Sequence, residues 1–250
     1  MKQKKRIVII GATSAIAQQC ARFWAIDNPI EFVLLGRNRE KLERTVSDLK
    51  VRAPNTKITS IIGNFLEPIE IHKIVGEIFK EGSVDIALIA HGVLPVQEVC
   101  QDDLQRCKEA LMVNGISPVL FAEIFAMHME KVDSGSLAVI GSVAGDRGRK
   151  SNYVYGSAKG LVARYIQGLQ HRLANTNIRV VLVKPGPTDT PMTAKLRESG
   201  AKLATVDRVA KEIVIGIEKG KKVVYTPRIW SAIMMIVRHL PYSIFNKLKI

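Results

Sequence analysis

The sequence predicts an α/β fold in which a doubly wound parallel sheet of about seven strands carries helices on both faces. Short β-branched or apolar runs alternate with longer segments of helical periodicity along the chain, which is typical of strand–helix–strand units. Some of these runs are apolar throughout, as expected of strands buried on both faces. The first run leads through small residues into a helix, so we expect ligands at the carboxyl ends of the strands.

The composition suits one large domain at residues 1–226, followed by a C-terminal tail at residues 227–250. Of the 250 residues 47% are hydrophobic, and the three cysteines show no paired motif. The N-terminus also lacks the apolar stretch of a signal peptide, so we expect a cytoplasmic protein with reduced thiols. A net charge of +14 favours an anionic partner. We expect no metal, and no nucleic acid because aromatic and basic residues are not interleaved.

Residues 6–10 predict the first strand, and the turn Gly11–Ala17 leads into a helix at residues 18–25. Gly11 suits the tight turn. The exposed amides at the start of the helix, with hydroxyls of Thr13 and Ser14, would receive a pyrophosphate. Alanines stand where the usual dinucleotide fingerprint has its second and third glycines. A plain strand–helix turn is the alternative interpretation.

The next strand, predicted at residues 32–35, is followed by Gly36-Arg37-Asn38-Arg39. An NAD-selective site would carry a carboxylate here to bind the ribose hydroxyls, and none is present. Arg37, with Arg39 as a less certain helper, would instead pair with a 2′-phosphate. We therefore favour NADP over NAD. The alternative is a solvated, basic start of a helix.

Two further strands are predicted at residues 57–62 and 85–90. Asn64 follows the first of them, where a polar side chain would touch the adenine edge. The second is an apolar central strand that ends at His91-Gly92. We interpret His91 as a wall of the cofactor site rather than a general base, because it stands at a strand end without metal-type spacing.

The long helical segment at residues 104–129 contains Asn114-Gly115 in its middle. This pair is unfavourable inside a helix, so it predicts a kink or a bulge where the Asn114 side chain has a task. A helix bend without chemistry remains the alternative.

A strand at residues 136–140 brings Ser142 to its carboxyl end, thirteen residues before Tyr155. If Tyr155 opens a helix that runs to residue 173, Lys159 lies one turn later on the same face. A cation near a phenol lowers its pKa from about 10 and prepares it for proton transfer. A bare Tyr-x-x-x-Lys pair also occurs by chance, so this interpretation depends on the rest of the chain.

The last predicted site segment is the loop at residues 184–192, after a strand at residues 179–183. Its prolines flank Gly186 and hold the loop rigid. Thr188 and Thr190 are placed to bond a nicotinamide carboxamide. Capping of the next helix is the alternative task for these threonines.

In this order and spacing, these motifs resemble the short-chain dehydrogenase/reductase family over residues 6–226. The resemblance implies a Rossmann-type fold and an NAD(P)-dependent oxidoreductase acting on CH–OH or C=O groups. It implies that Tyr155 is the acid/base, that Lys159 lowers its pKa and holds the nicotinamide ribose, that Ser142 polarises the substrate oxygen and that Asn114 anchors a proton-relay water. The expected cofactor-binding residues are Gly11, Thr13, Ser14, Ile16, Arg37, Asn64, Ala90, His91, Gly92, Tyr155, Lys159, Pro185, Gly186, Thr188 and Thr190.

The chain departs from the family pattern in two places. Ala15 replaces a glycine of the fingerprint, and Ile89-Ala90-His91-Gly92 stands where the family usually has Asn-Asn-Ala-Gly. These departures leave the details of the phosphate and adenosine contacts open, and they do not touch the residues that carry the chemistry.

The stretch Gly145–Tyr155 and the tail from Tyr225 resemble family members that reduce keto-pentoses carried on polyprenyl phosphate, for cell-envelope polysaccharide. That narrower resemblance implies a flavin-dependent oxidase as partner. Residues 219–250 hold seven Lys or Arg and no acidic residue. Their apolar run is too short to span a bilayer, so we expect an interfacial helix on the inner face of the cell membrane. Packing on the body or in an oligomer is the alternative.

We expect an NADPH-dependent reductase of a lipid-linked or small-molecule keto-sugar, acting as a homo-oligomer. The basic cluster Arg147, Arg149 and Lys150 would bind the phosphate of such a substrate, or would form a solvated loop. A reductase of another ketone or alcohol, such as a 3-oxoacyl or steroid substrate, is the second hypothesis. A non-catalytic NADP-sensing or nucleic-acid-binding protein is the third, and it would not need Ser142 and Tyr155 together.

Overall fold

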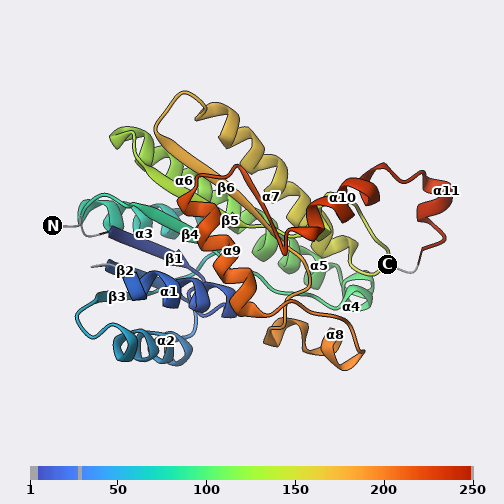
Figure 1. Cartoon of the computed structure of the whole chain (residues 1–250), viewed down its shortest axis with the longest axis horizontal. Coiled ribbons are helices and arrows are strands. Elements are labelled where there is room, and N and C mark those ends of the chain that lie inside the picture. Colours follow the sequence, from blue (N-terminus) through green and yellow to red (C-terminus); the bar gives the residue numbers. More distant parts are fainter. Residues whose placement is uncertain (1–4, 28–29, 249–250) are drawn as a thin grey trace.

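The structure is a computed structural model that describes residues 5–27 and 30–248. The start of the chain (residues 1–4), residues 28–29 and the last two residues of the predicted tail lie outside the described residues. One parallel sheet of seven strands forms the centre of the described chain (Figure 1), which confirms the predicted fold class. The strands are β1 (Lys5–Ile10), β2 (Ile30–Gly36), β3 (Lys57–Ile62), β4 (Ile86–Ile89), β5 (Gly135–Ile140), β6 (Ile178–Pro185) and β7 (Val223–Thr226).

Helices connect the strands and cover both faces of the sheet. They are α1 (Ala15–Asp27), α2 (Arg39–Arg52), α3 (Pro68–Lys80), α4 (Gln97–Asp102), α5 (Leu104–Leu111), α6 (Ser117–Val132), α7 (Tyr153–Arg172), α8 (Ala194–Glu198), α9 (Val206–Glu218), α10 (Ile229–His239) and α11 (Tyr242–Phe245). The predicted helix starts differ by two or three residues. The first helix begins at Ala15, and the helix expected to open at Tyr155 begins at Tyr153.

The strand order β3-β2-β1-β4-β5-β6-β7 creates one reversal in the sheet. The chain builds outward from β1 to β3 and then crosses back, so that β4 pairs with β1 on its other side. Connections leave the carboxyl ends of β1 and β4 in opposite directions, and ligands of open α/β sheets bind at such a switch point. The topology therefore places the predicted cofactor turn and His91 next to each other.

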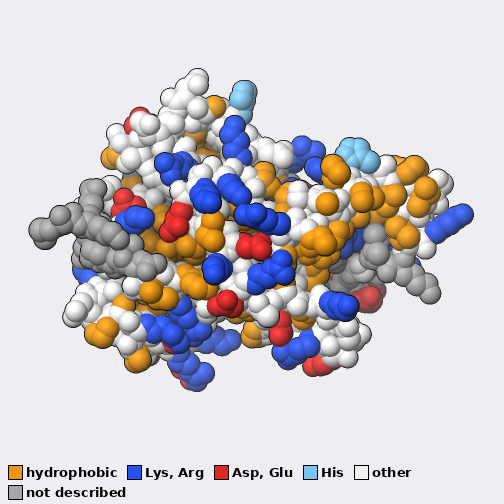
Figure 2. Space-filling view, in the orientation of Figure 1, with side chains coloured by type: hydrophobic (Ala, Val, Ile, Leu, Met, Phe, Trp, Pro, Cys, Tyr) orange, Lys and Arg blue, Asp and Glu red, His pale blue; other side chains and the backbone are white. Residues whose placement is uncertain are grey.

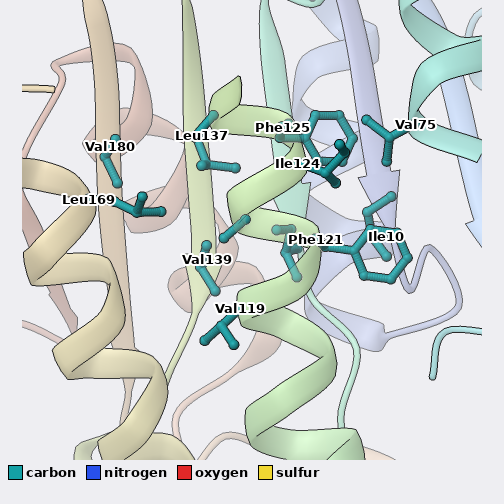
Figure 3. Close-up of a cluster of buried hydrophobic side chains, with 14 of the residues drawn as sticks. Ile10, Val75, Val119, Phe121, Ile124, Phe125, Leu137, Val139, Leu169 and Val180 are labelled. Atoms are coloured by element: carbon teal, nitrogen blue, oxygen red, sulfur yellow. The ribbon is translucent and has the colours of Figure 1, made fainter. Parts of the chain in front are cut away.

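Each face of the sheet carries its own apolar core, because side chains alternate along the central strands. On β1, Val8 and Ile10 pack under α3, α6 and α7, whereas Ile7 and Ile9 pack under α1, α2 and α9. Figure 3 shows Phe121 of α6 beside Ile10 in the first core. Burial of one such side chain contributes about 1.5–3 kcal/mol. The two cores therefore give the strand ends a rigid base.

The helical stretch Leu104–Val132 consists of α5, a five-residue π-helical segment (Met112–Ile116) and α6. Within the described residues it is the one helix long and apolar enough, by length and composition, to cross a membrane, and 67% of its apolar window is buried. It packs against the sheet as a core helix. The π-helical segment confirms the bulge that the Asn114-Gly115 pair predicts.

Candidate active site

Ser142, Tyr155 and Lys159 come together where β5 ends and α7 begins. Ser142 Oγ accepts a hydrogen bond from the backbone N of Ala144 (3.1 Å), which fixes the serine at the start of a short 3-10 turn. Tyr155 is the third residue of α7, and Lys159 Nζ lies 5.8 Å from the centre of its ring. Ser142 lies near enough to the phenol for its hydroxyl to influence the pKa of Tyr155. The three residues therefore share one small volume.

Burial determines the protonation of the tyrosine and the lysine. It raises the pKa of Tyr155 above its usual value, and the nearby Ser142 hydroxyl only partly opposes this. Burial also lowers the pKa of Lys159 to about 8, while its Nζ donates to the carbonyl of Ile140 (2.9 Å). The net pKa of Tyr155 therefore lies above its usual value and not below it as expected, because desolvation of the phenolate dominates.

Asn114 lies at the centre of the π-helical segment and is fully buried. Its Oδ1 accepts a hydrogen bond from the backbone N of Val93 (2.9 Å), and its Nδ2 donates to the carbonyl of Ala110 (2.9 Å). A Cβ atom added to Gly92 would lie 2.9 Å from Asn114 Oδ1 and 3.7 Å from Lys159 Nζ. Gly92 thus lets the amide and the ammonium approach one point, and the second lone pair of Oδ1 stays available for a water.

His91 follows β4 and packs against the aromatic rings of Phe65 and Phe121. Its Nε2 is 2.8 Å from Ser117 Oγ, whose hydroxyl donates to the carbonyl of Phe65. Nε2 is therefore the donor and carries the proton. Burial first, then the charges of Lys159 and Arg37, lower the pKa of His91 to about 3. A histidine that stays neutral and is held in place suits a wall of the site rather than an acid or base.

The turn after β1 is shaped by its contact with His91. Gly11 has a φ of 82°, and a Cβ atom there would lie 2.6 Å from the backbone N of His91, so only glycine fits. The backbone N atoms of Gly11 and Ala12 both donate to the carbonyl of Leu35 (3.0 and 2.9 Å). Thr13 and Ser14 remain half-buried before α1 begins. This tight turn, at a helix N-terminus, fits the pyrophosphate of a dinucleotide.

Arg37 and Asn64 lie at the ends of the two neighbouring strands. Arg37 is exposed directly after β2, near enough to His91 to lower its pKa, and residues 36–39 contain no carboxylate. Its position fits a 2′-phosphate. Asn64 is also exposed, but its Oδ1 accepts a hydrogen bond from the backbone N of Leu66 (3.0 Å). Its oxygen thus supports a turn, which leaves the amide NH₂ for a ligand.

The loop after β6 uses its threonines to hold its own shape. Thr188 is buried, and its Oγ1 donates to the carbonyl of Gly186 (2.9 Å). Thr190 forms a capping box with Thr193 at the start of the short helix that follows. The alternative task predicted for these threonines, helix capping, is therefore present at Thr190.

A buried charge pair that the sequence did not reveal fastens the loop after Ser142. Asp146 forms an ion pair with Lys184 of β6, and both side chains are at most 6% exposed. Tyr225 of β7 donates its hydroxyl to the other oxygen of Asp146 (2.7 Å). Three separate elements supply these residues, so no local spacing signals the cluster. It ties the loop between Ser142 and Tyr155 to the edge of the sheet.

Two of the three basic residues that were expected to bind a substrate phosphate contact the C-terminal helices instead. Arg147 Nη1 donates to the carbonyls of Val237 and Leu240 (both 2.6 Å), and Arg149 Nη2 lies 3.9 Å from Met234 Sδ. Within the predicted cluster, Lys150 is exposed, whereas Arg147 and Arg149 are partly buried. Arg147 and Arg149 therefore hold the C-terminal helices, which the sequence placed in a separate tail, and neither lies in a solvated loop.

Comparison with known proteins agrees with this geometry. The family model described as short chain dehydrogenase matches residues 5–201. An uncharacterised oxidoreductase from the mprA 5′ region of Streptomyces coelicolor is 27% identical over 98% of this chain and 96% of its own length. An uncharacterised oxidoreductase of Mycobacterium tuberculosis is 27% identical over 97% of this chain and 96% of its own length. Both matches therefore extend into the C-terminal helices.

Solved structures share the fold. A short-chain dehydrogenase from Sphingobium yanoikuyae in complex with NADPH has a TM-score of 0.82 at 18% identity, covering 98% of this chain and 96% of that one. The bulky-bulky ketone specific alcohol dehydrogenase from Comamonas testosteroni has a TM-score of 0.79 at 20% identity, covering 98% and 95%. The family model covers most of the chain, including every site residue described above except Tyr225 and those of the C-terminal helices. This match shows that the protein belongs to the short chain dehydrogenase family of NAD(P)-dependent oxidoreductases.

Proposed function

We propose that this protein is an NADPH-dependent reductase that transfers hydride to a keto group. The observation that carries the proposal is the shared position of Ser142, Tyr155 and Lys159 beside Asn114. Bound NADPH would supply the hydride. The buried phenol of Tyr155 is protonated at neutral pH, which is the form that donates a proton to the carbonyl oxygen as it becomes an alcohol.

The other residues would act on the charge that the proton transfer leaves behind. The Ser142 hydroxyl would hydrogen-bond the carbonyl oxygen and polarise it. The Lys159 ammonium would stabilise the phenolate of Tyr155, because a cation a few ångströms away is effective inside a buried site. Asn114 would hold a water that returns a proton to the site. Each role uses an atom that the fold keeps in place.

The preference for NADPH rests on the end of β2. Arg37 is exposed there and residues 36–39 lack the carboxylate that would select NAD. Two structural neighbours bind the same cofactor: the Sphingobium yanoikuyae dehydrogenase is in complex with NADPH, and ElxO has NADP bound. Replacing Arg37 with Asp would therefore be the direct route to NAD use.

For the substrate, we propose a keto-sugar carried on polyprenyl phosphate, as in decaprenylphosphoryl-2-keto-erythro-pentose reductase. The support is that the Gly145–Tyr155 stretch and the C-terminal segment resemble those of that reductase. The C-terminal segment lies outside the family model, which ends at residue 201. The relatives from Streptomyces coelicolor and Mycobacterium tuberculosis match through that segment as well. Such a substrate needs a flavin-dependent oxidase to generate its keto group. It also requires the enzyme to contact the inner face of the membrane.

The experiment measures NADPH oxidation with a polyprenylphosphoryl 2-keto-pentose against a panel of plain ketones, a 3-oxoacyl thioester and a steroid. We expect kcat/KM to be highest for the lipid-linked keto-sugar. A higher kcat/KM for another ketone would support the proposed reductase activity and reject the lipid-linked keto-sugar as its substrate. No consumption of NADPH with any of the compounds would reject the reductase.

Replacement of Tyr155 with Phe tests the chemistry itself. The variant loses the proton donor and keeps the ring, so we expect kcat to fall by at least about a hundredfold while NADPH still binds. Turnover and the fluorescence of bound NADPH measure the two properties separately. Replacement of Tyr153, which is 43% exposed on the same helix, with Phe is the matched control. An active Tyr155→Phe variant would refute the mechanism.

A further inference from the structure

The C-terminal helices lie across both loops that border the reacting groups. We call residues 227–248, with α10 and α11, the C-terminal arm. Figure 1 shows α10 and α11 projecting from the body on the side opposite the N-terminus. The arm contacts the loop between Ser142 and Tyr155, and it contacts the loop that follows β6. It therefore bridges two segments that meet at the active site but come from different strands.

Arg147 is the main attachment of the arm to the first loop. Its Nη1 donates to the carbonyl of Val237, in the last turn of α10, and to that of Leu240, the residue that follows the helix. The last carbonyls of a helix lack a partner within it, so they are free to accept from a side chain. Its guanidinium also lies 3.8 Å from the ring centre of Phe245 and 5.3 Å from that of Tyr242. One side chain thus caps α10 and holds α11 by cation–π contact.

Trp230 attaches the arm to the second loop. A Cβ atom on Gly186 would lie 2.0 Å from Trp230 Nε1, so the indole rests directly against the glycine backbone. One turn later, Met234 is fully buried and contacts Arg149 of the first loop. The inner face of α10 therefore touches both loops within four residues.

We propose that the C-terminal arm is a clamp that holds the two active-site loops together, with Arg147 as its positioning residue. This inference rests on the proposed function at one point, namely that the two loops border the site of hydride and proton transfer. Arg147 stands five residues after Ser142 and eight before Tyr155, so a change in its position moves the segment that carries both. Arg147 acts on the substrate through this segment.

The arm depends on these contacts for its own order. α10 has 11 residues and α11 has four, and isolated helices of this length are unstable in water. Half of the large apolar side chains of the arm are exposed and only Met234 among them is fully buried, so apolar burial alone does not fix its position. The guanidinium of Arg147 therefore contributes a large share of what keeps the arm in place. Its removal should free the arm and leave the sheet intact.

The test compares Arg147→Met, Arg147→Lys and Lys150→Met, where Lys150 is an exposed cation three residues away in the same loop. All are made in a Trp24→Phe background, so that fluorescence reports Trp230 alone. For Arg147→Met we expect a red shift of Trp230 emission and a fall in kcat/KM for a soluble ketone of at least about tenfold. Arg147→Lys should recover part of both the emission and kcat/KM. With a soluble ketone that carries no phosphate for Lys150 to bind, Lys150→Met should keep kcat/KM within about twofold of the parent.

Phe245→Ala keeps the proposal falsifiable if Arg147→Met folds poorly, because it removes the stacking partner from the far end of the arm. Like Arg147→Met, it should lower kcat/KM and shift Trp230 emission to the red. In the Arg147→Met/Phe245→Ala double variant, the loss of transition-state stabilisation should be smaller than the sum of the losses in the two single variants. An Arg147→Met protein that matches Lys150→Met in both readouts overturns the clamp. Emission needs no turnover, so an inactive parent would refute the proposed function and still leave the clamp testable.

Discussion

At the scale of single residues, desolvation decides which chemistry the site favours. A phenol with a raised pKa rests in its protonated form, and a lysine with a pKa of about 8 is still mostly charged at neutral pH. A protonated donor next to a cation is ready to give up its proton to a developing alkoxide. Alcohol oxidation needs the phenolate at the start, which burial makes costly. The resting protonation is therefore the form that the proposed ketone reduction needs.

The pH dependence of reduction follows from Lys159. Its pKa of about 8 is lower than the usual 10.5 because burial disfavours the charged form, so its charge is present below pH 8 and disappears as the pH rises through 8. We expect kcat for ketone reduction to be level from pH 6 to 7 and to decline above 8. The guanidinium of a Lys159→Arg variant stays charged throughout this range, so the slower rate of that variant should lack the decline. A rate that rises through pH 8 would contradict the assignment.

Gly11 offers a test of the cofactor turn. Alanine there would need a φ of 82° and would place its Cβ 2.6 Å from the backbone of His91. We expect Gly11→Ala to lower the free energy of unfolding by more than about 2 kcal/mol and to weaken NADPH binding. Urea unfolding and fluorescence titration measure the two effects. In α3, a Cβ added to Gly76 would meet no atom within 4 Å beyond its chain neighbours and the backbone of its own helix. Gly76→Ala should therefore stabilise the protein by about 0.5–1 kcal/mol.

The sequence was informative about residues whose role depends on a local pattern. The Asn114-Gly115 pair predicted a bulge because both residues are poor in helices, and the bulge is present. Nothing local indicates that Lys184 pairs with Asp146, since the ion pair joins positions 38 residues apart. The pKa of Tyr155 was also mispredicted, because spacing shows that a cation is near and does not show how deeply the phenol is buried.

At the scale of elements, the segment between β5 and α7 is held from both sides. Asp146 joins it to β6 through Lys184 and to β7 through Tyr225, while Arg147 joins it to α10. Burial and the bond to Asp146 raise the pKa of Tyr225, which keeps its hydroxyl a donor at all working pH values. The loop therefore belongs to the rigid part of the molecule, although it has no regular structure beyond a single 3-10 turn.

Replacement of Asp146 with Asn measures the value of this attachment. The change leaves the ammonium of Lys184 buried without its charge partner, so we expect a loss of about 3 kcal/mol in the free energy of unfolding. Adding Lys184→Met should recover part of that loss. Glu40→Gln, in an ion pair with Arg44 that is exposed on α2, should cost less than about 0.5 kcal/mol. Equal losses in Asp146→Asn and Glu40→Gln, by urea unfolding, would contradict the assignment.

At the scale of the whole molecule, the alternation of strands and helices predicted the architecture, and the arm was harder to place. Periodicity over residues 229–237 indicated an apolar helix and could not say which residues it covers. The structure shows that its inner face packs on the body through Met234, while its outer face stays exposed. Packing on the body and contact with a membrane, the two alternatives for the tail, are therefore compatible, because they would use opposite faces of the same helix.

The outer face of the arm and the net charge make a joint prediction about membranes. Figure 2 shows hydrophobic side chains gathered over α10 and α11, where Met235, Ile236 and Ile244 are 50–60% exposed. Residues 219–250 carry seven Lys or Arg and no acidic side chain, which suits a surface of anionic lipid.

Changing Met235, Ile236 and Ile244 together to Ser removes apolar area from this face and leaves Trp230, Met234 and Arg147 untouched. Insertion of each large apolar side chain contributes on the order of 1 kcal/mol, so vesicle binding should weaken by at least about tenfold. Sedimentation with vesicles of phosphatidylglycerol and phosphatidylcholine measures it, and activity on a soluble ketone should not change. Ile69→Ser on α3, 86% exposed and far from the arm in sequence, should bind like the parent. Equal binding of the triple variant and the parent would show that the charge alone, or another face, meets the lipid.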